Sequence, residues 1–261
     1  MPKTRPIREE DGNSAVMRIV SLLEAVAQAG VPPATADLIE SLKLPKPTVH
    51  RMVTMLERVR LLEREPSARR LMPGPRLRAL AFSTIESSRT RAPWHAVLAA
   101  LSDRIGETCS FSMLYGNEVV VLDRIETNWG LRLQLPAGAR VPAHCTSSGK
   151  LLLSYLPRKV RERLIGTAPL KPYGKNTITD PKKLDAALAE IRKTRVGTDN
   201  EEYFTGLVGV AVPVLADGRR VVATVSVNAP AARMSLPGLL KHVGALKAAA
   251  AELSDTLTDN A

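Results

Sequence analysis

The side chains best placed for chemistry lie on one expected helix, residues 46–58, and suit recognition of a polyanion. Four apolar residues follow the i, i+3, i+4, i+7 spacing of a buried helical stripe: Val49, Met52, Val53 and Leu56. The opposite face carries hydroxyl, imidazole and guanidinium groups: Thr48, His50, Arg51, Thr54 and Arg58. Such groups donate hydrogen bonds to phosphate oxygens and to base edges. The helix therefore has one face for a core and one suited to nucleic acid.

The preceding residues indicate how this helix would be presented. Residues 34–42 read as a short helix and Leu44–Lys46 as a tight turn. A short helix, a turn and a second helix form a helix-turn-helix, whose second helix enters the DNA major groove. The residues expected to meet base edges or phosphates are Lys46, Thr48, His50 and Arg51. Taken alone, the pattern also fits a helical hairpin with a solvated basic face.

Positive charge is concentrated directly after this helix. The 261 residues have a formal net charge of +11. Residues 1–57 carry seven basic and seven acidic side chains, whereas residues 58–91 carry nine arginines and three glutamates, a net charge of +6. Two short strands near 61–64 and 71–75, joined by a charged turn, predict a β-wing. The wing residues expected to grip the DNA backbone are Arg64, Arg69 and Arg70.

Composition argues against several other classes of protein. An apolar fraction of 44% suffices for packed cores, and an aromatic fraction of 3% argues against a stacking platform for single-stranded nucleic acid. Two cysteines without CxxC or Cys/His spacing predict neither a disulfide framework nor a metal site. The longest apolar run, residues 206–216, has about half the length of a membrane span. The N-terminus lacks the apolar segment of a signal peptide, so we expect a cytoplasmic protein. We also expect neither a metal nor a cofactor.

The length favours two domains. The expected order is a flexible arm (1–12), a winged helix-turn-helix (13–75), a linker helix (76–91) and a second domain (92–258). Ser14 and Thr35 could cap the first two helices. The linker helix is basic and exposed, is ended by Pro93, and is a candidate dimer contact.

The second domain mixes strand and helix patterns. The expected strands are 108–114, 119–125, 131–135, 207–215 and 221–228, and the last two are joined at Asp217-Gly218. The expected helices are 147–156, 182–195 and 236–257. Mixed strands flanked by helices predict an α+β domain with a mixed or antiparallel sheet.

Four short signatures occur in order along the chain. They are Leu44–Arg51 at the start of the recognition helix, His144–Lys150 with its His-x-x-x-x-Gly-Lys spacing, Thr177–Asp180 followed by Leu184, and Asp199–Glu202 followed by Gly206 and Gly209–Pro213. Each is modest alone. Together, from about Ser14 to near the C-terminus, they resemble the IclR family of bacterial transcription regulators.

The resemblance implies a winged helix-turn-helix, a linker helix and a GAF-like C-terminal domain that binds a small effector. It also implies homodimers, often paired as dimers of dimers, on palindromic or repeated operators in double-stranded DNA. The effector contacts carried over from the family's pocket positions are Val141, Ser147, Ser148, Asp199, Gly209, Ser226 and Asn228.

Three departures from the family pattern have structural consequences. Arg60 stands where a glycine usually follows the recognition helix, and Arg195 stands at the glycine four positions before the acidic motif. Ser147 and Ser148 replace residues that are commonly small and apolar, which predicts a more polar pocket. Backbone amides at the start of a helix favour anions, so the expected effector is anionic. The resemblance implies either an aromatic acid or a keto acid.

Several alternatives remain at this stage. Ser147 could be a plain N-cap instead of an effector contact. Ser147–Lys150 also resembles the tail of a phosphate-binding loop, but His144 and Leu151 stand where that motif requires Gly and Ser or Thr. Glu201 and Glu202, adjacent on a strand, would point to opposite faces and not act as a catalytic pair. We expect no catalytic residue; the rival functions are a DNA-binding protein without a ligand response and a small-molecule enzyme.

Overall fold

The computed structural model divides the chain into two units, Met1–Thr84 and Ile85–Ala261. It describes residues 14–29, 31–65, 69–86, 91–127, 129, 135–136, 138–166, 169–216 and 218–258. The expected arm at 1–12, the tip of the wing at 66–68 and most of the expected strand at 131–135 lie outside these residues. Each unit is described by itself.

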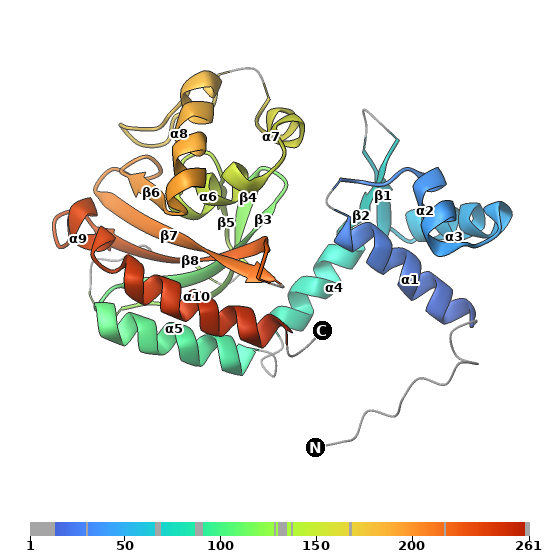
Figure 1. Ribbon diagram of the computed structural model, residues 1–261, viewed down its shortest axis with the longest axis horizontal. Coiled ribbons are helices and arrows are strands. Elements are labelled where there is room, and N and C mark those ends of the chain that lie inside the picture. The colour runs from blue at the N-terminus through green and yellow to red at the C-terminus, as the bar shows by residue number, and fades with distance from the viewer. Residues whose placement is uncertain are drawn as a thin grey trace. The chain divides into compact units, whose positions relative to one another are not determined.

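The described residues of the N-terminal unit form three helices and a two-stranded wing, followed by the first part of a fourth helix, α4, Pro75–Glu86 (Figure 1). Its elements are α1 (Ala15–Gln28), α2 (Thr35–Leu42), α3 (Lys46–Arg58), β1 (Leu62–Arg64) and β2 (Leu71–Pro73). β1 and β2 pair antiparallel. The predicted stripe of α3 is buried and packs with Leu22, Leu38, Leu62 and Leu71. The predicted winged helix-turn-helix is confirmed.

The two expected helix caps differ in outcome. Ser14 caps α1, since its Oγ accepts a hydrogen bond from the Met17 N–H at 3.2 Å. The prediction for Thr35 is wrong, because α2 already begins at this residue and Ala34 occupies the cap position. The Ala34 N–H instead donates to Asp37 Oδ2 at 2.8 Å. A carboxylate in the first turn also interacts favourably with the helix dipole.

Two positions where the family usually has glycine adopt left-handed backbone conformations in this chain. Arg60, after α3, has a φ of 61°. Arg195 has a φ of 59° and ends α8 (Pro181–Thr194). Glycine adopts this region without a steric penalty, whereas other residues do so at a cost. Both arginines therefore occupy positions where glycine would fit with less strain.

The basic segment after the wing forms α4 (Pro75–Glu86), and the next helix, α5 (Arg91–Ile105), begins at Arg91. The sequence predicted that Pro93 ends the linker helix. In the structure Pro93 lies in the first turn of α5 instead. A proline is tolerated there because the first N–H groups of a helix have no acceptor within the helix.

The C-terminal unit is built on a six-stranded sheet in the order β5-β4-β3-β8-β7-β6 (Figure 1). The strands are β3 (Thr108–Tyr115), β4 (Glu118–Ile125), β5 (Arg140–Pro142), β6 (Gly197–Asn200), β7 (Leu207–Ala216) and β8 (Arg220–Pro230). Every pairing described between them is antiparallel. The edge strands β5 and β6 were not predicted, because each is short and lacks an alternating apolar pattern.

Helices cover both faces of this sheet (Figure 1). α6 (Ser147–Tyr155) and α8 pack on one face, and α5 and α10 (Val243–Thr258) pack on the other. The helix α7 (Arg158–Ile165) follows α6 in the chain. The single helix expected at 236–257 is two, α9 (Leu236–Leu240) and α10, with a tight turn in which the Lys241 N–H donates to the Gly238 carbonyl. The predicted α+β class is confirmed.

Apolar packing fixes α6 over the strands. Leu151 and Leu153 of α6 and Leu188 of α8 belong to one buried cluster with Val119 and Ala211 of the sheet. Two glycines, Gly197 and Gly149, permit the start of α6 to lie close to the neighbouring backbone. A Cβ at Gly197 would stand 2.2 Å from the Ser147 carbonyl oxygen, and one at Gly149 would stand 2.2 Å from that of Ala143. The start of α6 is therefore held directly against the sheet.

Candidate functional site

The recognition helix presents the predicted DNA-contacting residues away from its buried stripe. Lys46, His50 and Arg51 are exposed and Thr48 is half-buried, whereas Val49 is fully buried. Lys46 is the first residue of α3, at the positive end of the helix dipole. This face combines donors and positive charge in the arrangement that phosphates and base edges require.

The three wing arginines have different surroundings. Arg64 forms a 2.7 Å ion pair with Glu57 of α3 and donates to the carbonyl of Arg69 at 3.0 Å. Arg70 donates to the carbonyl of Pro32 at 2.9 Å. Arg69 itself is exposed. Arg64 thus also ties the wing to α3, and Arg70 ties it to the segment between α1 and α2, which the sequence did not indicate.

A cavity of about 40 Å³, lined by both polar and apolar side chains, lies between the sheet and the start of α6. Six of the seven expected effector contacts line it: Val141, Ser147, Ser148, Asp199, Ser226 and Asn228. The other lining residues are Ser110, Ser112, Val119, Val121, Arg124, Leu135, Thr146, Tyr203 and Leu207. The seventh expected contact, Gly209, lies beneath the side chains of Asn228 and Ser147.

Strand register explains why residues from the acidic motif and the last strand meet. Asp199 on β6 pairs with Gly209 on β7, and Gly209 pairs with Asn228 on β8. Directly paired residues on adjacent strands project to the same face of a sheet. The three positions therefore form one row across the sheet, under the start of α6.

A second row runs beside the first. Ser226 lies two residues before Asn228, and therefore on the same face of β8. Ser226 pairs with Ser110 on β3, and Ser110 pairs with Arg124 on β4. This row brings a guanidinium into the cavity from a strand on the far side of β3.

The first turn of α6 is capped by Thr146, whose Oγ1 accepts a hydrogen bond from the Gly149 N–H at 3.2 Å. The alternative that Ser147 is the N-cap is therefore wrong. Ser147 and Ser148 are 3% and 4% exposed and both line the cavity. Their hydroxyls are placed to interact with whatever occupies it.

Among the nine lining residues that the sequence reasoning missed, Arg124 is the charged one. Its side chain is 4% exposed, and Nη1 lies 3.4 Å from Ser110 Oγ. Burial lowers the pKa of Arg124, although a guanidinium remains charged in proteins. A signal was present in the sequence, because Asp123-Arg124 interrupts an otherwise apolar strand. Two adjacent charges in such a strand point to opposite faces, so one of them was bound to face the α6 side.

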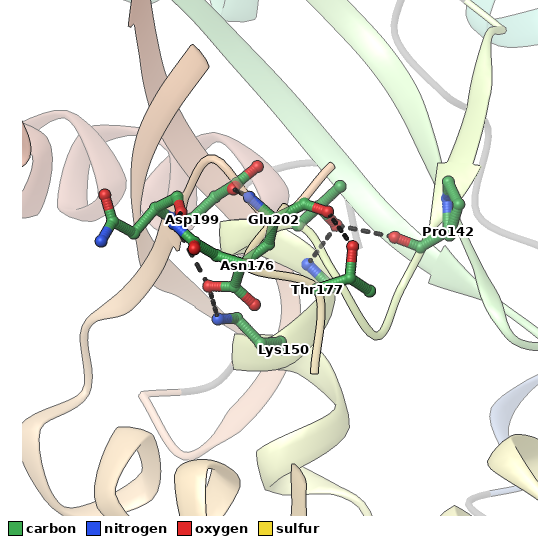
Figure 2. A network of polar contacts seen from close by, with 9 residues as sticks. Pro142, Lys150, Asn176, Thr177, Asp199 and Glu202 are labelled. Atoms are coloured by element: carbon green, nitrogen blue, oxygen red, sulfur yellow. Dashed lines mark hydrogen bonds and ion pairs between the residues drawn. The ribbon is translucent and has the colours of Figure 1, made fainter. Parts of the chain in front are cut away.

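A buried ion pair beside the cavity joins α6 to the turn after β6 (Figure 2). Lys150 of α6 pairs with Glu202, and both side chains are buried. The Glu202 N–H donates to Asp199 Oδ1 at 2.8 Å, and the Glu202 carbonyl accepts a hydrogen bond from Thr177 Oγ1 at 2.5 Å. The Glu202 carboxylate is thus bound to Lys150, and the Glu202 backbone N–H holds the Asp199 carboxylate in position.

Glu201 lies in a different environment from Glu202. Its carboxylate pairs with Lys175 at 3.0 Å and accepts a hydrogen bond from the Gly206 N–H at 2.8 Å. β6 ends at Asn200, and Glu201 has a left-handed φ of 59°. The two glutamates do not form a pair because they lie in the turn after β6 and have different partners, not because of the strand alternation that the sequence suggested.

Burial shifts two acidic groups near the cavity. It raises the pKa of Asp199 from 3.8 to about 7, with the nearby Glu202 carboxylate adding to the effect. The pKa of the Cys145 thiol rises to about 12, again because of burial. A thiol of this kind is a poor nucleophile, whereas the Asp199 carboxyl can donate as well as accept hydrogen bonds near neutral pH.

Two negative findings apply to the described ranges. Within them, His, Cys, Asp and Glu side chains do not gather in a group of three that could hold a metal ion. None of the helices in that part of the chain is long and apolar enough to cross a membrane.

Family comparison assigns both units. Residues 15–66 match the IclR helix-turn-helix domain, and residues 82–255 match the C-terminal domain of bacterial transcriptional regulators of the IclR type. The chain is 41% identical over 247 residues to a probable transcriptional regulator, SauR, of Cupriavidus necator, covering 95% of this chain and 98% of the relative.

Solved structures of IclR proteins have a similar fold. The IclR protein of Thermotoga maritima superposes with a TM-score of 0.61 at 26% identity, covering 93% of this chain and 98% of that one. An IclR homolog from Microbacterium hydrocarbonoxydans, complexed with 4-hydroxybenzoate, superposes with a TM-score of 0.60 at 27% identity, covering 94% and 99%. These proteins are transcription regulators and not enzymes. The chain therefore belongs to the IclR family of bacterial transcription regulators, with a DNA-binding helix-turn-helix and an effector-binding domain.

Proposed function

We propose that this regulator binds operator DNA as a homodimer, and that a small anionic effector in the cavity under α6 changes that binding. The observation that carries the proposal is the convergence of six expected effector contacts around one cavity. A pocket with a few convergent polar groups is the usual form of a small-molecule site.

On the DNA side, α3 enters the major groove. Lys46, Thr48, His50 and Arg51 meet base edges or phosphates, and Arg64, Arg69 and Arg70 contact the backbone from the wing. Roughly half or more of protein–DNA hydrogen bonds go to phosphate and sugar, so most of these residues set affinity more than sequence preference.

On the effector side, the ligand is an acid, either aromatic or a keto acid. Support comes from the Arg124 guanidinium in the cavity lining and from the backbone amides at the start of α6. The complex of the Microbacterium homolog with 4-hydroxybenzoate is further support. The effector contacts are the seven residues carried over from the family, Val141, Ser147, Ser148, Asp199, Gly209, Ser226 and Asn228.

The two sites communicate through the arrangement of the protomers. The two winged helices of a dimer, or four in a dimer of dimers, reach half-sites one or more helical turns apart, ~34 Å per turn. Effector binding shifts the placement of the heads through the linker helix expected at 76–91. It can do so only if the effector prefers one arrangement, and by reciprocity the DNA must then change effector affinity by the same factor. Such a protein works in the cytoplasm, on chromosomal DNA.

The test is fluorescence anisotropy with the purified protein and the intergenic DNA upstream of its own gene. Binding is measured at two salt concentrations, with and without a panel of aromatic and short-chain acids, and random DNA of equal length is the control. We expect tight binding that weakens steeply with salt, because Lys and Arg release counterions from phosphates. We also expect at least one acid to change the affinity.

The outcomes discriminate between the candidate functions. Binding no tighter than to random DNA would argue against this operator. Specific binding that no acid changes would favour a DNA-binding protein without a ligand response. Equal effector affinity of the free and operator-bound protein would remove the coupling, whatever the affinity for DNA.

A further inference from the structure

A second pocket, the edge pocket, lies at the margin of the sheet in the C-terminal unit. It has a volume of about 240 Å³, and no residue lines both this pocket and the cavity under α6. The lining residues come from the end of α8, the last part of β7 and one side of α10: Arg195, Pro213, Leu215, Lys247, Ala250, Ala251 and Ser254. The edge pocket is therefore a candidate site separate from the expected effector contacts.

The edge pocket exists because β6 is much shorter than β7 (Figure 1). β6 pairs with Val208–Ala211 of β7, and α8 ends shortly before β6 begins. Within the described part of the chain, no strand pairs with the outer side of Pro213–Ala216. This stretch of the sheet edge, the end of α8 and the side of α10 therefore enclose an open hollow.

The free edge of β7 is poorly suited to receive another strand. Residue 213 is a proline, which has no N–H to donate. The Leu215 N–H already donates to Ser254 Oγ at 3.2 Å, and this hydroxyl donates to the Ala250 carbonyl at 2.8 Å. Proline and covered edge groups are means by which proteins prevent edge-to-edge pairing. A small molecule therefore suits the edge pocket better than a peptide strand.

Two cations beside the edge pocket have no acidic partner among the described residues. Arg195 and Lys247 are exposed, and neither side chain forms an ion pair or a hydrogen bond with another described residue. The two preceding cations of α8 are engaged, since Arg192 lies over an aromatic ring and Lys193 forms an ion pair. Like charges beside one hollow repel each other, and an anion between them removes this repulsion. The edge pocket therefore favours an anionic ligand.

Arg195 also has a backbone conformation that is unfavourable for an arginine. Its φ of 59° lies in the left-handed region, where a Cβ is sterically disfavoured and glycine is the usual residue at a helix end. The helix dipole does not explain the arginine, because Arg192 and Lys193 already place positive charge in the last turn of α8. Strained residues cluster where a side chain has a function. Binding an anion at the edge pocket is such a function.

The edge pocket combines its two charges with an apolar floor, formed by Pro213, Leu215 and Ala250. Its volume of about 240 Å³ exceeds the roughly 150 Å³ of a cavity that binds benzene, so a group of that size fits. A phosphate monoester carries a charge of about −1.5 to −2 at pH 7 and has three acceptor oxygens. It therefore matches two cations better than a singly charged acid does, and both arginine and lysine bind phosphate.

We propose that the edge pocket binds a small organic phosphate. Arg195 and Lys247 hold the phosphoryl group, and the apolar part of the ligand packs against Pro213, Leu215 and Ala250. The edge pocket is then a second ligand site of the regulator, in addition to the effector site proposed under α6. Since the two hollows share no lining residue, either site can exist without the other.

The ligand-side experiment is isothermal titration calorimetry with the full-length wild-type protein at about pH 8, where phenyl phosphate is doubly charged. Phenyl sulfate has the same shape and one charge fewer, and inorganic phosphate lacks the apolar part. We expect phenyl phosphate to bind at least roughly tenfold more tightly than either of the other two. The proposal is overturned if phenyl phosphate does not bind at millimolar concentration, or if phenyl sulfate or inorganic phosphate binds as tightly.

The variant-side experiment compares R195A and K247A with the matched control K193A. Lys193 is exposed, lies two residues from Arg195 and does not line the edge pocket. We expect R195A and K247A each to lose at least roughly tenfold in affinity for phenyl phosphate, and K193A to stay within about twofold of wild type. Binding that R195A and K247A leave unchanged belongs to another site and overturns the proposal.

The variant R195G separates loss of the site from loss of folding. Glycine relieves the left-handed strain, so the midpoint of urea unfolding should be at least that of the wild type. Affinity for phenyl phosphate should nevertheless fall at least roughly tenfold, as in R195A. A folded R195G with the affinity of the wild type would overturn the assigned role of Arg195.

Discussion

Gly209 lies directly beneath Asn228, which lines the cavity under α6, and a Cβ at position 209 would stand 2.5 Å from Asn228 Oδ1. The same Cβ would lie 3.2 Å from Ser147 Oγ. Glycine at this position therefore leaves room for two side chains that are proposed to contact the effector. The absence of a side chain, not its presence, is what this position contributes to the site.

The substitution G209A should impair effector binding more than folding. The new methyl group meets the ends of side chains, which can rotate away, so the stability loss should be about 1 kcal/mol. Rotation of Asn228 and Ser147 removes their polar groups from their present positions, and effector affinity should fall at least roughly tenfold. Calorimetry and urea unfolding measure the two effects. G244A is the control, because a Cβ there meets nothing within 4 Å; equal effector binding in wild type and G209A would contradict the prediction.

The substitutions R60G and R195G should stabilise their respective units. Both arginines are exposed and have left-handed φ angles of 61° and 59°. The left-handed conformation costs roughly 1–2 kcal/mol for a residue with a Cβ, and the extra chain entropy of glycine in the unfolded state offsets part of the gain. We expect each change to raise the free energy of unfolding by up to about 1 kcal/mol, measured in urea. R60A and R195A retain the Cβ and should give no gain.

The raised pKa of Asp199, about 7, should make stability depend on pH. Because the folded state binds the proton more tightly than the unfolded state, stability falls as pH rises from the ordinary pKa of 3.8 to about 7, then levels off. Burial is the main cause of the raised pKa; the Glu202 carboxylate adds to it, and the Lys150 ammonium opposes it. The variant D199N lacks this titration, so its unfolding free energy should decline less between pH 5 and pH 8 than that of the wild type. Urea unfolding at both pH values measures this difference, and parallel declines would refute the prediction.

The same titration should affect an anionic effector. A neutral Asp199 carboxyl donates a hydrogen bond and does not repel an acid, so affinity should increase as pH falls from 8 to 6. The measurement is calorimetry across this range, with a ligand already fully ionised at pH 6. D199N should show a flatter profile, and a profile as steep as that of the wild type would assign the pH dependence to another group.

The buried Lys150–Glu202 pair should be costly to break from one side. The substitution E202Q leaves the ammonium of Lys150 without its carboxylate, and such single changes cost about 3–5 kcal/mol. The double variant K150M/E202M removes both charges and should recover most of this loss. Urea unfolding of the single and double variants measures the coupling. E190Q breaks the exposed Lys193–Glu190 pair and should cause no measurable change.

The exposed basic residues of α3 should govern the salt dependence of DNA binding. For K46A and R51A, we expect weaker binding, and the slope of log affinity against log salt should decrease by about 1 for each phosphate that is no longer neutralised. Anisotropy at several salt concentrations measures this slope. K159A, an exposed lysine on α7 in the other unit, is the control and should retain the wild-type slope. An unchanged slope in both α3 variants would place the phosphate-binding residues elsewhere.

Local sequence patterns determined the elements whose signals are local. The apolar spacing of Val49, Met52, Val53 and Leu56 fixed the orientation of α3, because a helix of 3.6 residues per turn brings these positions to one side. Ser14 capped α1 as expected, since an N-cap depends only on residues three positions away. Motif order alone also indicated the family.

Tertiary structure decided what depends on strand register and close packing. No local pattern shows that Ser110 pairs with both Ser226 and Arg124, because strand pairing joins positions far apart in the chain. The edge strand β6 was not predicted, since Gly197–Asn200 has no apolar alternation and exists because β7 pairs with it. Thr146, not Ser147, caps α6, and only the packed structure shows that this leaves Ser147 free to line the cavity. The sequence thus named most of the candidate effector contacts through family resemblance, whereas strand register brings Arg124 to the same cavity.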